Sequence, residues 1–223
     1  MVSGPKSNLS EDDPLQLFVK KTLNFLATYK AYFISSFIAI LLLIIGIFLY
    51  LQNQQKLLVT SKKNLMLANK KLNEKKYEES RKLFLDVINI SPDINIKNRA
   101  KLNLSNVYKS QKKYNDSIEV LNSALKDISE NIEGKNAIEY ELVYRALISI
   151  HMKTKDCHNI SKLLSKDFKI TKKDDLLLEL GRCYEQKGNT KESLKVFKEL
   201  MQKYPKSPFV TNRIKILNSS GKI

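Results

Sequence analysis

The chain has 223 residues and a formal net charge of +16, and only 5 Pro and 6 Gly interrupt a composition rich in Leu, Ile, Lys, Glu and Asn. This composition favours an all-helical protein, and two cysteines are too few for a disulfide-rich scaffold. The positive charge is compatible with nucleic acid, anionic lipid or an acidic protein as partner. However, the lysines are not accompanied by the aromatic and Arg residues that bind single-stranded nucleic acid, and a biased genome composition would also produce them.

Residues 1–30 form a short N-terminal tail. Three acidic residues at 11–13 followed by Pro14 are typical of the start of a helix. The apolar residues that then recur at helical spacing, opposite two lysines, are Leu15, Phe18, Val19, Leu26 and Tyr29. This pattern predicts either a short amphipathic helix on a membrane surface or an extension of a membrane helix.

Residues 31–51 contain no charged side chain and consist mainly of Leu, Ile and Phe. As a helix this segment would be roughly 32 Å long, which is close to the hydrocarbon thickness of a bilayer. Tyr32 and Tyr50 stand near its ends, where aromatic rings favour the membrane interface. We therefore predict a single transmembrane helix, followed by a linker helix at 52–60. The apolar run is too long for a cleaved signal peptide, so we expect an uncleaved signal anchor.

Residues 61–207 contain an internal helix–turn–helix repeat. Its clearest copy contains, in order, Leu180, Gly181, Tyr184, Gly188, Ser193, Phe197 and Pro205. The small residues would let two helices approach closely, the aromatic residues would fill the space between helices, and the proline would end the second helix. We predict four repeats, at 61–94, 98–131, 141–174 and 174–207, of which the third is degenerate because its small residues are lost.

These residues resemble the tetratricopeptide (TPR) repeat, a helix–turn–helix unit of about 34 residues. The resemblance implies an all-α solenoid, and residues 208–223 are expected to supply a capping helix and a tail. A coiled coil is the alternative, but the apolar residues follow no sustained heptad. TPR proteins generally bind peptide segments or partner helices on a concave surface that is lined by the first helix of each repeat.

The resemblance places one set of residues on that concave face. They are Leu65, Asn69, Leu72, Arg99, Leu102, Asn106, Lys109, Arg145, Ser149, Met152, Leu178, Arg182 and Glu185. This mixture of Leu, Asn and basic residues would suit an extended acidic, amphipathic segment. Asn69 and Asn106 resemble the Asn pair with which chaperone-docking TPR domains hold a terminal carboxylate, but Leu65 stands where those domains carry a lysine.

Motifs of catalysis are not found in the sequence, since it has no phosphate-binding glycine loop, no GxSxG and no HExxH. We therefore expect no enzyme, no catalytic residue and no cofactor. His151, Cys157, His158 and Cys183 are zinc-binding residue types, but their spacing matches no standard site, so core packing is the preferred interpretation. Cys157 and Cys183 would approach within bonding range if their helices pack together, and a disulfide would then form in an oxidising compartment.

The order of tail, membrane helix and TPR repeats is similar to that of the YfgM-type ancillary subunit of the bacterial Sec translocon. This resemblance implies a single-pass protein of the inner membrane, and an interaction module that scaffolds or assists a translocation, chaperone or envelope-assembly complex. The alternative is a basic domain that organises a membrane surface by binding anionic lipid or nucleic acid. Lysines are more frequent after the membrane helix than before it, which predicts cytoplasmic repeats. The family resemblance instead predicts periplasmic repeats, which we favour.

Overall fold

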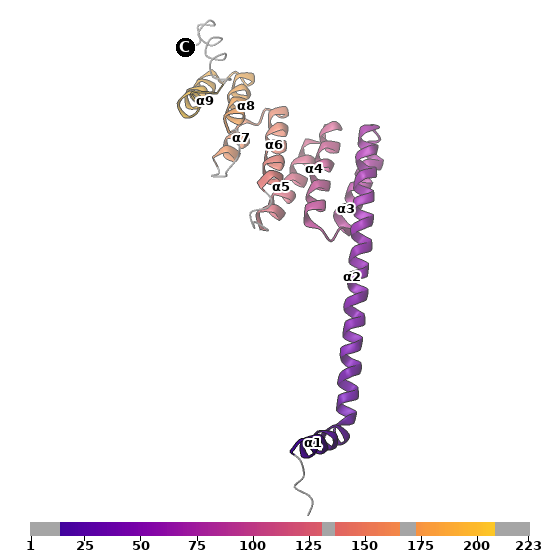
Figure 1. The fold of residues 1–223 in the computed structure, drawn as a ribbon. Coiled ribbons are helices and arrows are strands. Elements are labelled where there is room, and N and C mark those ends of the chain that lie inside the picture. Colours follow the sequence, from indigo (N-terminus) through magenta and orange to yellow (C-terminus); the bar gives the residue numbers. More distant parts are fainter. Residues whose placement is uncertain (1–13, 131–136, 166–172, 208–223) are drawn as a thin grey trace, which may run out of the picture. The chain divides into compact units, whose positions relative to one another are not determined.

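The computed structural model describes residues 14–130, 137–165 and 173–207, and every regular element in these segments is an α-helix (Figure 1). The predicted all-α fold, with one long apolar helix followed by repeated helix pairs, is confirmed. The chain divides into two compact units, residues 1–55 and residues 56–223. The capping helix predicted at 208–223 lies outside the described residues.

The first unit contains α1 (Pro14–Thr28) and the beginning of α2 (Lys30–Asn73). Tyr29 lies between the two helices and belongs to neither, so α1 is a separate helix and not an extension of α2. The Tyr29 ring lies 4.8 Å from the ring of Phe25 in α1 and 6.3 Å from the ring of Tyr32 in α2, measured between centroids. An aromatic cluster therefore connects the two helices across their junction.

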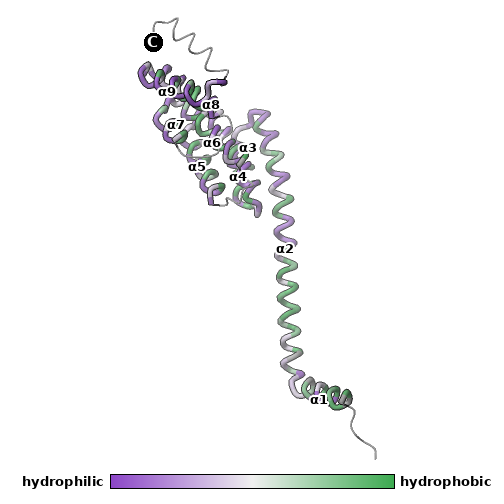
Figure 2. Tube along the Cα trace, turned by 60° about the vertical axis from the view of Figure 1, so that its left-hand side comes forward, coloured by the Kyte–Doolittle hydropathy of each residue, from purple (hydrophilic) through white to green (hydrophobic). Residues whose placement is uncertain are grey.

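Helix α2 has 44 residues and contains an 18-residue window with a mean hydropathy of 2.8, none of which is buried inside the structure. Figure 2 shows that the apolar residues occupy the N-terminal part of this helix, where residues 31–51 lie. An exposed surface of this kind is unfavourable in water, because each apolar side chain left in contact with water loses its burial free energy. By length and composition, α2 is able to cross a membrane.

The second unit is a series of helix pairs. The end of α2 pairs with α3 (Tyr77–Ile90), α4 (Ile94–Ser110) with α5 (Tyr114–Glu130), α6 (Ala137–Lys153) with α7 (Cys157–Leu164), and α8 (Lys173–Gln186) with α9 (Thr190–Lys203). Asp93, Asp156 and Asn189 begin α4, α7 and α9, and the side chain of each accepts a backbone N–H from the first turn. These caps explain why each of the three helices begins where it does.

Small residues hold the first two pairs together. The Ser80 hydroxyl donates to the carbonyl oxygen of Ala68 at 2.9 Å, and the Ser117 hydroxyl donates to the carbonyl oxygen of Ser105 at 2.8 Å. Both serines are fully buried, so each hydroxyl needs such a partner. The two helices of a pair can therefore approach until a side chain of one bonds to the backbone of the other.

Gly181 has the corresponding role in the last pair. A Cβ atom at this position would lie 2.3 Å from Cε1 of the Phe197 ring, which is too close for any side chain. Around these contacts lie two clusters of buried apolar side chains. One is formed by α2, α3 and α4, with Phe84 and Leu104 among its members, and the other extends from α5 to α9 and includes Tyr144.

The turn inside each pair has the same unusual backbone conformation. The residues with a positive φ are Lys75 (59°), Lys112 (60°), Lys155 (55°) and Gly188 (76°). In each case the N–H of the next residue donates to the carbonyl five residues before it, as from Lys113 to Tyr108. This is the Schellman ending of a helix, for which Gly is the preferred residue. The sequence predicted a turn glycine at position 188 only.

We expect Lys112→Gly to raise the free energy of unfolding by about 0.5–1 kcal/mol, because glycine adopts the left-handed conformation without the steric cost that a side chain has there. Lys82→Gly, in the middle of α3, is the control and should lower it by about 1 kcal/mol. Chemical denaturation followed by circular dichroism measures both. Destabilisation by Lys112→Gly equal to that of the control would contradict the assigned turn.

Candidate functional site

A groove of about 580 Å³ lies between α6 and α8, the first helices of the third and fourth pairs. Side chains of both helices line it, among them Arg145, Ser149 and Met152 from α6 and Asp175, Leu178 and Arg182 from α8. Arg145, Ser149, Met152, Leu178 and Arg182 belong to the predicted concave set. The structure therefore brings five of the predicted residues, from two segments of the chain, to one groove.

An ion-pair network crosses this groove. Arg145 Nη1 lies 2.7 Å from Asp175 Oδ2 on α8, and Arg145 Nε lies 2.8 Å from Glu141 Oε1 on α6. Burial alone would lower the pKa of Arg145, but its hydrogen bonds to the two carboxylates outweigh that effect and raise the pKa. Arg145 is therefore a fixed positive charge that connects the two helices.

Arg182 is more accessible than Arg145. Its guanidinium pairs with Glu179 at 2.9 Å on the same helix, and the two side chains are 46% and 37% exposed. Exposed pairs of this kind contribute little free energy. A carboxylate of a partner can therefore replace Glu179 at Arg182 more easily than it can replace Asp175 at Arg145.

Other predicted residues form contacts between successive first helices. Lys109 Nζ donates to Ser149 Oγ at 2.9 Å, which joins α4 to α6. Asn103 Nδ2 donates to Asn69 Oδ1 at 2.9 Å, which joins α2 to α4. In chaperone-docking TPR domains the corresponding Asn side chain binds the ligand. Here the amide oxygen of Asn69 already accepts a hydrogen bond from the neighbouring repeat.

The remaining predicted residues differ in exposure. Leu65 and Leu178 are buried, with 8% and 4% of their surface exposed, because the neighbouring helices cover them, and they present little area to a partner. Partly buried side chains that pack against the two core clusters are those of Leu72, Leu102 and Met152. Of the predicted residues that lie outside the groove, Arg99 and Asn106 are exposed and Glu185 is half-buried.

Two acidic residues, Asp175 and Glu179, also line the groove. Asp175 stands in the first turn of α8, and its carboxylate accepts a hydrogen bond from Arg145. The neighbouring Asp174 instead accepts a hydrogen bond from the Ser207 hydroxyl at 2.7 Å. Glu179 could have been found from its spacing three residues before Arg182, which is typical of an ion pair on one helix face.

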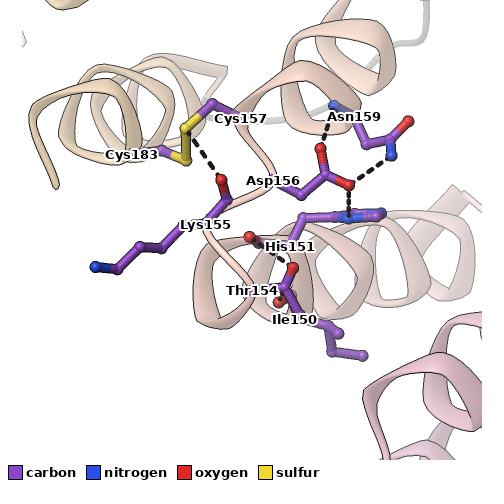
Figure 3. Close-up of a disulfide and its surroundings, with 8 residues drawn as sticks. All are labelled: Ile150, His151, Thr154, Lys155, Asp156, Cys157, Asn159 and Cys183. Atoms are coloured by element: carbon purple, nitrogen blue, oxygen red, sulfur yellow. Dashed lines mark hydrogen bonds and ion pairs between the residues drawn. A yellow bond between two sulfur atoms is a disulfide. The ribbon is translucent and has the colours of Figure 1, made fainter. Parts of the chain in front are cut away.

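The Cys and His residues that are of zinc-binding type do not form a metal site; Figure 3 shows three of them, His151, Cys157 and Cys183. Cys157 and Cys183 form a disulfide that joins α7 to α8, with the two Cα atoms 5.6 Å apart. Their sulfurs are therefore not available as thiolate ligands. Among the residues that the structure describes, no cluster of three potential ligands is present.

His151 is buried, with 7% of its surface exposed, as the prediction of a core position requires. Its Nδ1 lies 3.3 Å from Asp156 Oδ2. The same carboxylate accepts from the side chain and the backbone N–H of Asn159 at the start of α7 (Figure 3). Burial lowers the pKa of His151 below its usual value, and the charge of Asp156 only partly opposes this shift.

We expect the free energy of unfolding to fall as the pH is lowered from 7.5 to 5.5. The pKa of His151 is lower in the folded chain than in the unfolded chain. In this pH window the unfolded chain therefore binds more protons at His151, which favours unfolding. The variant His151→Phe keeps an aromatic ring in the core and should lose much of this dependence, whereas His158→Phe, at an exposed position, should retain it. Denaturation at several pH values tests this, and an unchanged slope in His151→Phe would contradict it.

Two segments of the second unit match models of a known repeat family. Residues 99–126, within α4 and α5, and residues 175–207, which include most of α8 and all of α9, each match a family model described as tetratricopeptide repeat. No curated protein matches the chain. The two matches support a TPR protein, and TPR repeats are in general modules that bind other proteins. The groove between α6 and α8 takes one of its two walls from the second matched segment.

Proposed function

We propose that the protein is a membrane-anchored interaction module whose groove between α6 and α8 holds an extended segment of a partner protein. The observation that carries this proposal is the composition of the groove, which combines an apolar floor with charged residues from both helices. Ile148 and Leu178 are buried beneath it, and Met152 is partly exposed. Its volume of about 580 Å³ is sufficient for several side chains of a bound segment.

The charges of the groove favour an acidic, amphipathic partner. Four basic residues, Arg145, Lys153, Lys155 and Arg182, and two acidic residues, at 175 and 179, line it, which leaves two positive charges in excess. Apolar side chains of the partner would contact Met152, and its carboxylates would approach the accessible guanidinium of Arg182. The anchor in α2 would confine this binding to the membrane surface, in the service of a translocation, chaperone or envelope-assembly complex.

We expect Arg182→Glu and Met152→Asp to abolish capture of the partner by the full-length chain in a neutral detergent. Arg182 is exposed, so its substitution should not disturb folding. Lys198→Glu, at an exposed position on α9, introduces the same charge change outside the groove and is the matched control. Mass spectrometry of the captured proteins would identify those lost with the groove variants but retained with the control. Identical capture by all the variants would refute the proposal.

We further propose that the repeats lie outside the cytoplasm. The disulfide between Cys157 and Cys183 supports this placement, because disulfides are rare where cellular thiols keep cysteines reduced. The TPR domain would then be periplasmic, with α2 as a single-pass anchor in the inner membrane.

In intact cells, both cysteines should therefore resist alkylation after denaturation unless a reductant is added first. In the purified protein, reduction or Cys157→Ser should lower the free energy of unfolding by about 3 kcal/mol, since the cross-link joins residues 26 positions apart. Free thiols in freshly denatured cells, alkylated without reductant, would place the repeats in the cytoplasm. Protease treatment of spheroplasts provides an independent readout of the same orientation.

A further inference from the structure

The turns inside the helix pairs carry a row of lysines. We call residues 74–76, 111–113, 154–156 and 187–189 the turn edge. Its lysines are Lys75, Lys76, Lys112, Lys113, Lys155 and Lys187, and all of them are exposed. Each turn has one residue with a positive φ, and these residues occupy equivalent positions in the four helix pairs. This residue is Lys in three of the four turns.

Contacts place these turns next to one another. Gln111 of the second turn donates to Glu78 Oε1, just after the first turn, at 3.0 Å. A hollow of about 340 Å³ is lined by Lys112 and Lys113 of the second turn and by Thr154 of the third. Lys155 of the third turn and Gln186, the last residue of α8, line the same groove, and the fourth turn follows Gln186 directly. The turns therefore follow one another along a single edge of the second unit.

Little of this charge is neutralised within the protein. Of the acidic residues in the turn edge, Glu74 pairs with Lys76 at 3.0 Å and Asp156 pairs with His151. Within the described segments, Lys75, Lys112 and Lys155 make no ion pair. Each of them also has a positive φ, a backbone conformation that is unfavourable for lysine. At Lys75, Lys112 and Lys155 the turn edge thus presents positive charge that is not held in an ion pair within the described segments.

A lysine-rich composition alone does not account for this row. Asn is also abundant in the chain, and after Gly it is the residue that best tolerates a left-handed backbone. If genome composition alone had enriched Lys and Asn, Asn would be expected at these positions, because it adopts a positive φ with less strain than Lys does. Lys occurs there in three of the four turns, so the charge is present in spite of its conformational cost.

We propose that the turn edge binds an acid-rich segment of a partner protein, on a surface that meets the groove at Lys155. The first helices α4, α6 and α8 contact one another in turn, so successive turns are spaced by roughly 10 Å. An extended chain rises about 3.3 Å per residue, so a carboxylate at every third residue would match the row. Lys75 and Lys112 do not line the groove, so at these two turns the proposal does not depend on the function of the groove.

Two other anionic partners fit this surface less well. Single-stranded nucleic acid requires several aromatic rings for base stacking, and within the hollow at the second and third turns Tyr114 is the ring that could serve. A membrane surface is a plane and favours apolar side chains that insert beside the lysines. The turn edge is a narrow row, and its described residues include no exposed large apolar side chain.

The test compares two triple variants of the full-length chain in nanodiscs of neutral lipid. The turn variant carries Lys75→Gly, Lys112→Gly and Lys155→Gly, which remove three charges and relieve the backbone strain. The control carries Lys82→Gln, Lys162→Gln and Lys198→Gln, which remove the same charge from exposed positions on α3, α7 and α9. A fluorescent peptide of 20 glutamates is the probe, and its anisotropy reports binding.

We expect the turn variant to bind the peptide about tenfold more weakly than the unchanged chain, and the control less than about threefold more weakly. The turn variant should also melt at a higher temperature, which excludes misfolding as the cause of its weaker binding. Equal weakening in both variants, or no binding by the unchanged chain, would overturn the proposal. A selective loss of binding to phosphatidylserine vesicles or to an oligonucleotide, with peptide binding intact, would overturn it in favour of that partner.

Discussion

The close approach of the two helices within the first, second and fourth pairs is the contact on which the second unit depends. Ser80 reaches the backbone of Ala68, and Ser117 reaches that of Ser105, so a larger residue at either site would separate the helices. Gly181 leaves room for the ring of Phe197 in the same way. This spacing allows each pair to close through a tight left-handed turn and to bury one apolar face, and the next pair then covers the other face. The grooves and edges of the second unit follow from that arrangement.

The third pair is the exception, and the structure holds it differently. Ile148 and Ile160 are both buried at the positions where the other pairs have small residues, and α7 has only 8 residues. A short helix buries little surface and contributes little stability by itself. The disulfide from Cys157 to Cys183 fastens α7 to α8, and the ion pair of Arg145 with Asp175 fastens α6 to α8. The disulfide and the ion pair therefore connect both helices of the third pair to α8, directly beside the groove.

Much of the fold could be predicted because it depends on local pattern. The uncharged apolar run that lies within α2 and the recurring small, aromatic and turn residues are visible in the sequence without any knowledge of distant contacts. The left-handed turns at Lys75, Lys112 and Lys155 were missed because glycine is the usual sign of such a turn, and the hydrogen bonds that impose it belong to the backbone. The disulfide stayed an open alternative because it depends on the packing of α7 against α8.

The candidate site was less predictable than the fold. The repeat frame predicted which face of each helix points inward, but not how deeply the neighbouring helices cover that face. The burial of Leu65 and Leu178 could therefore not be predicted. Asp175 and Arg145 lie 30 residues apart in the chain, so their pairing could not be read from the spacing within one helix. Sequence identifies which residues can meet a partner, whereas the packing of successive repeats determines which of them remain free to do so.

Photocrosslinking in living cells tests the central claim, that the groove between α6 and α8 holds a partner of a membrane-anchored protein. A photoreactive residue would replace Met152, which lines the groove, and in a second strain Lys198, which is exposed on α9. We predict a discrete crosslinked product of the membrane fraction from position 152 and none from position 198. The same product from both positions, or none from position 152, would contradict it.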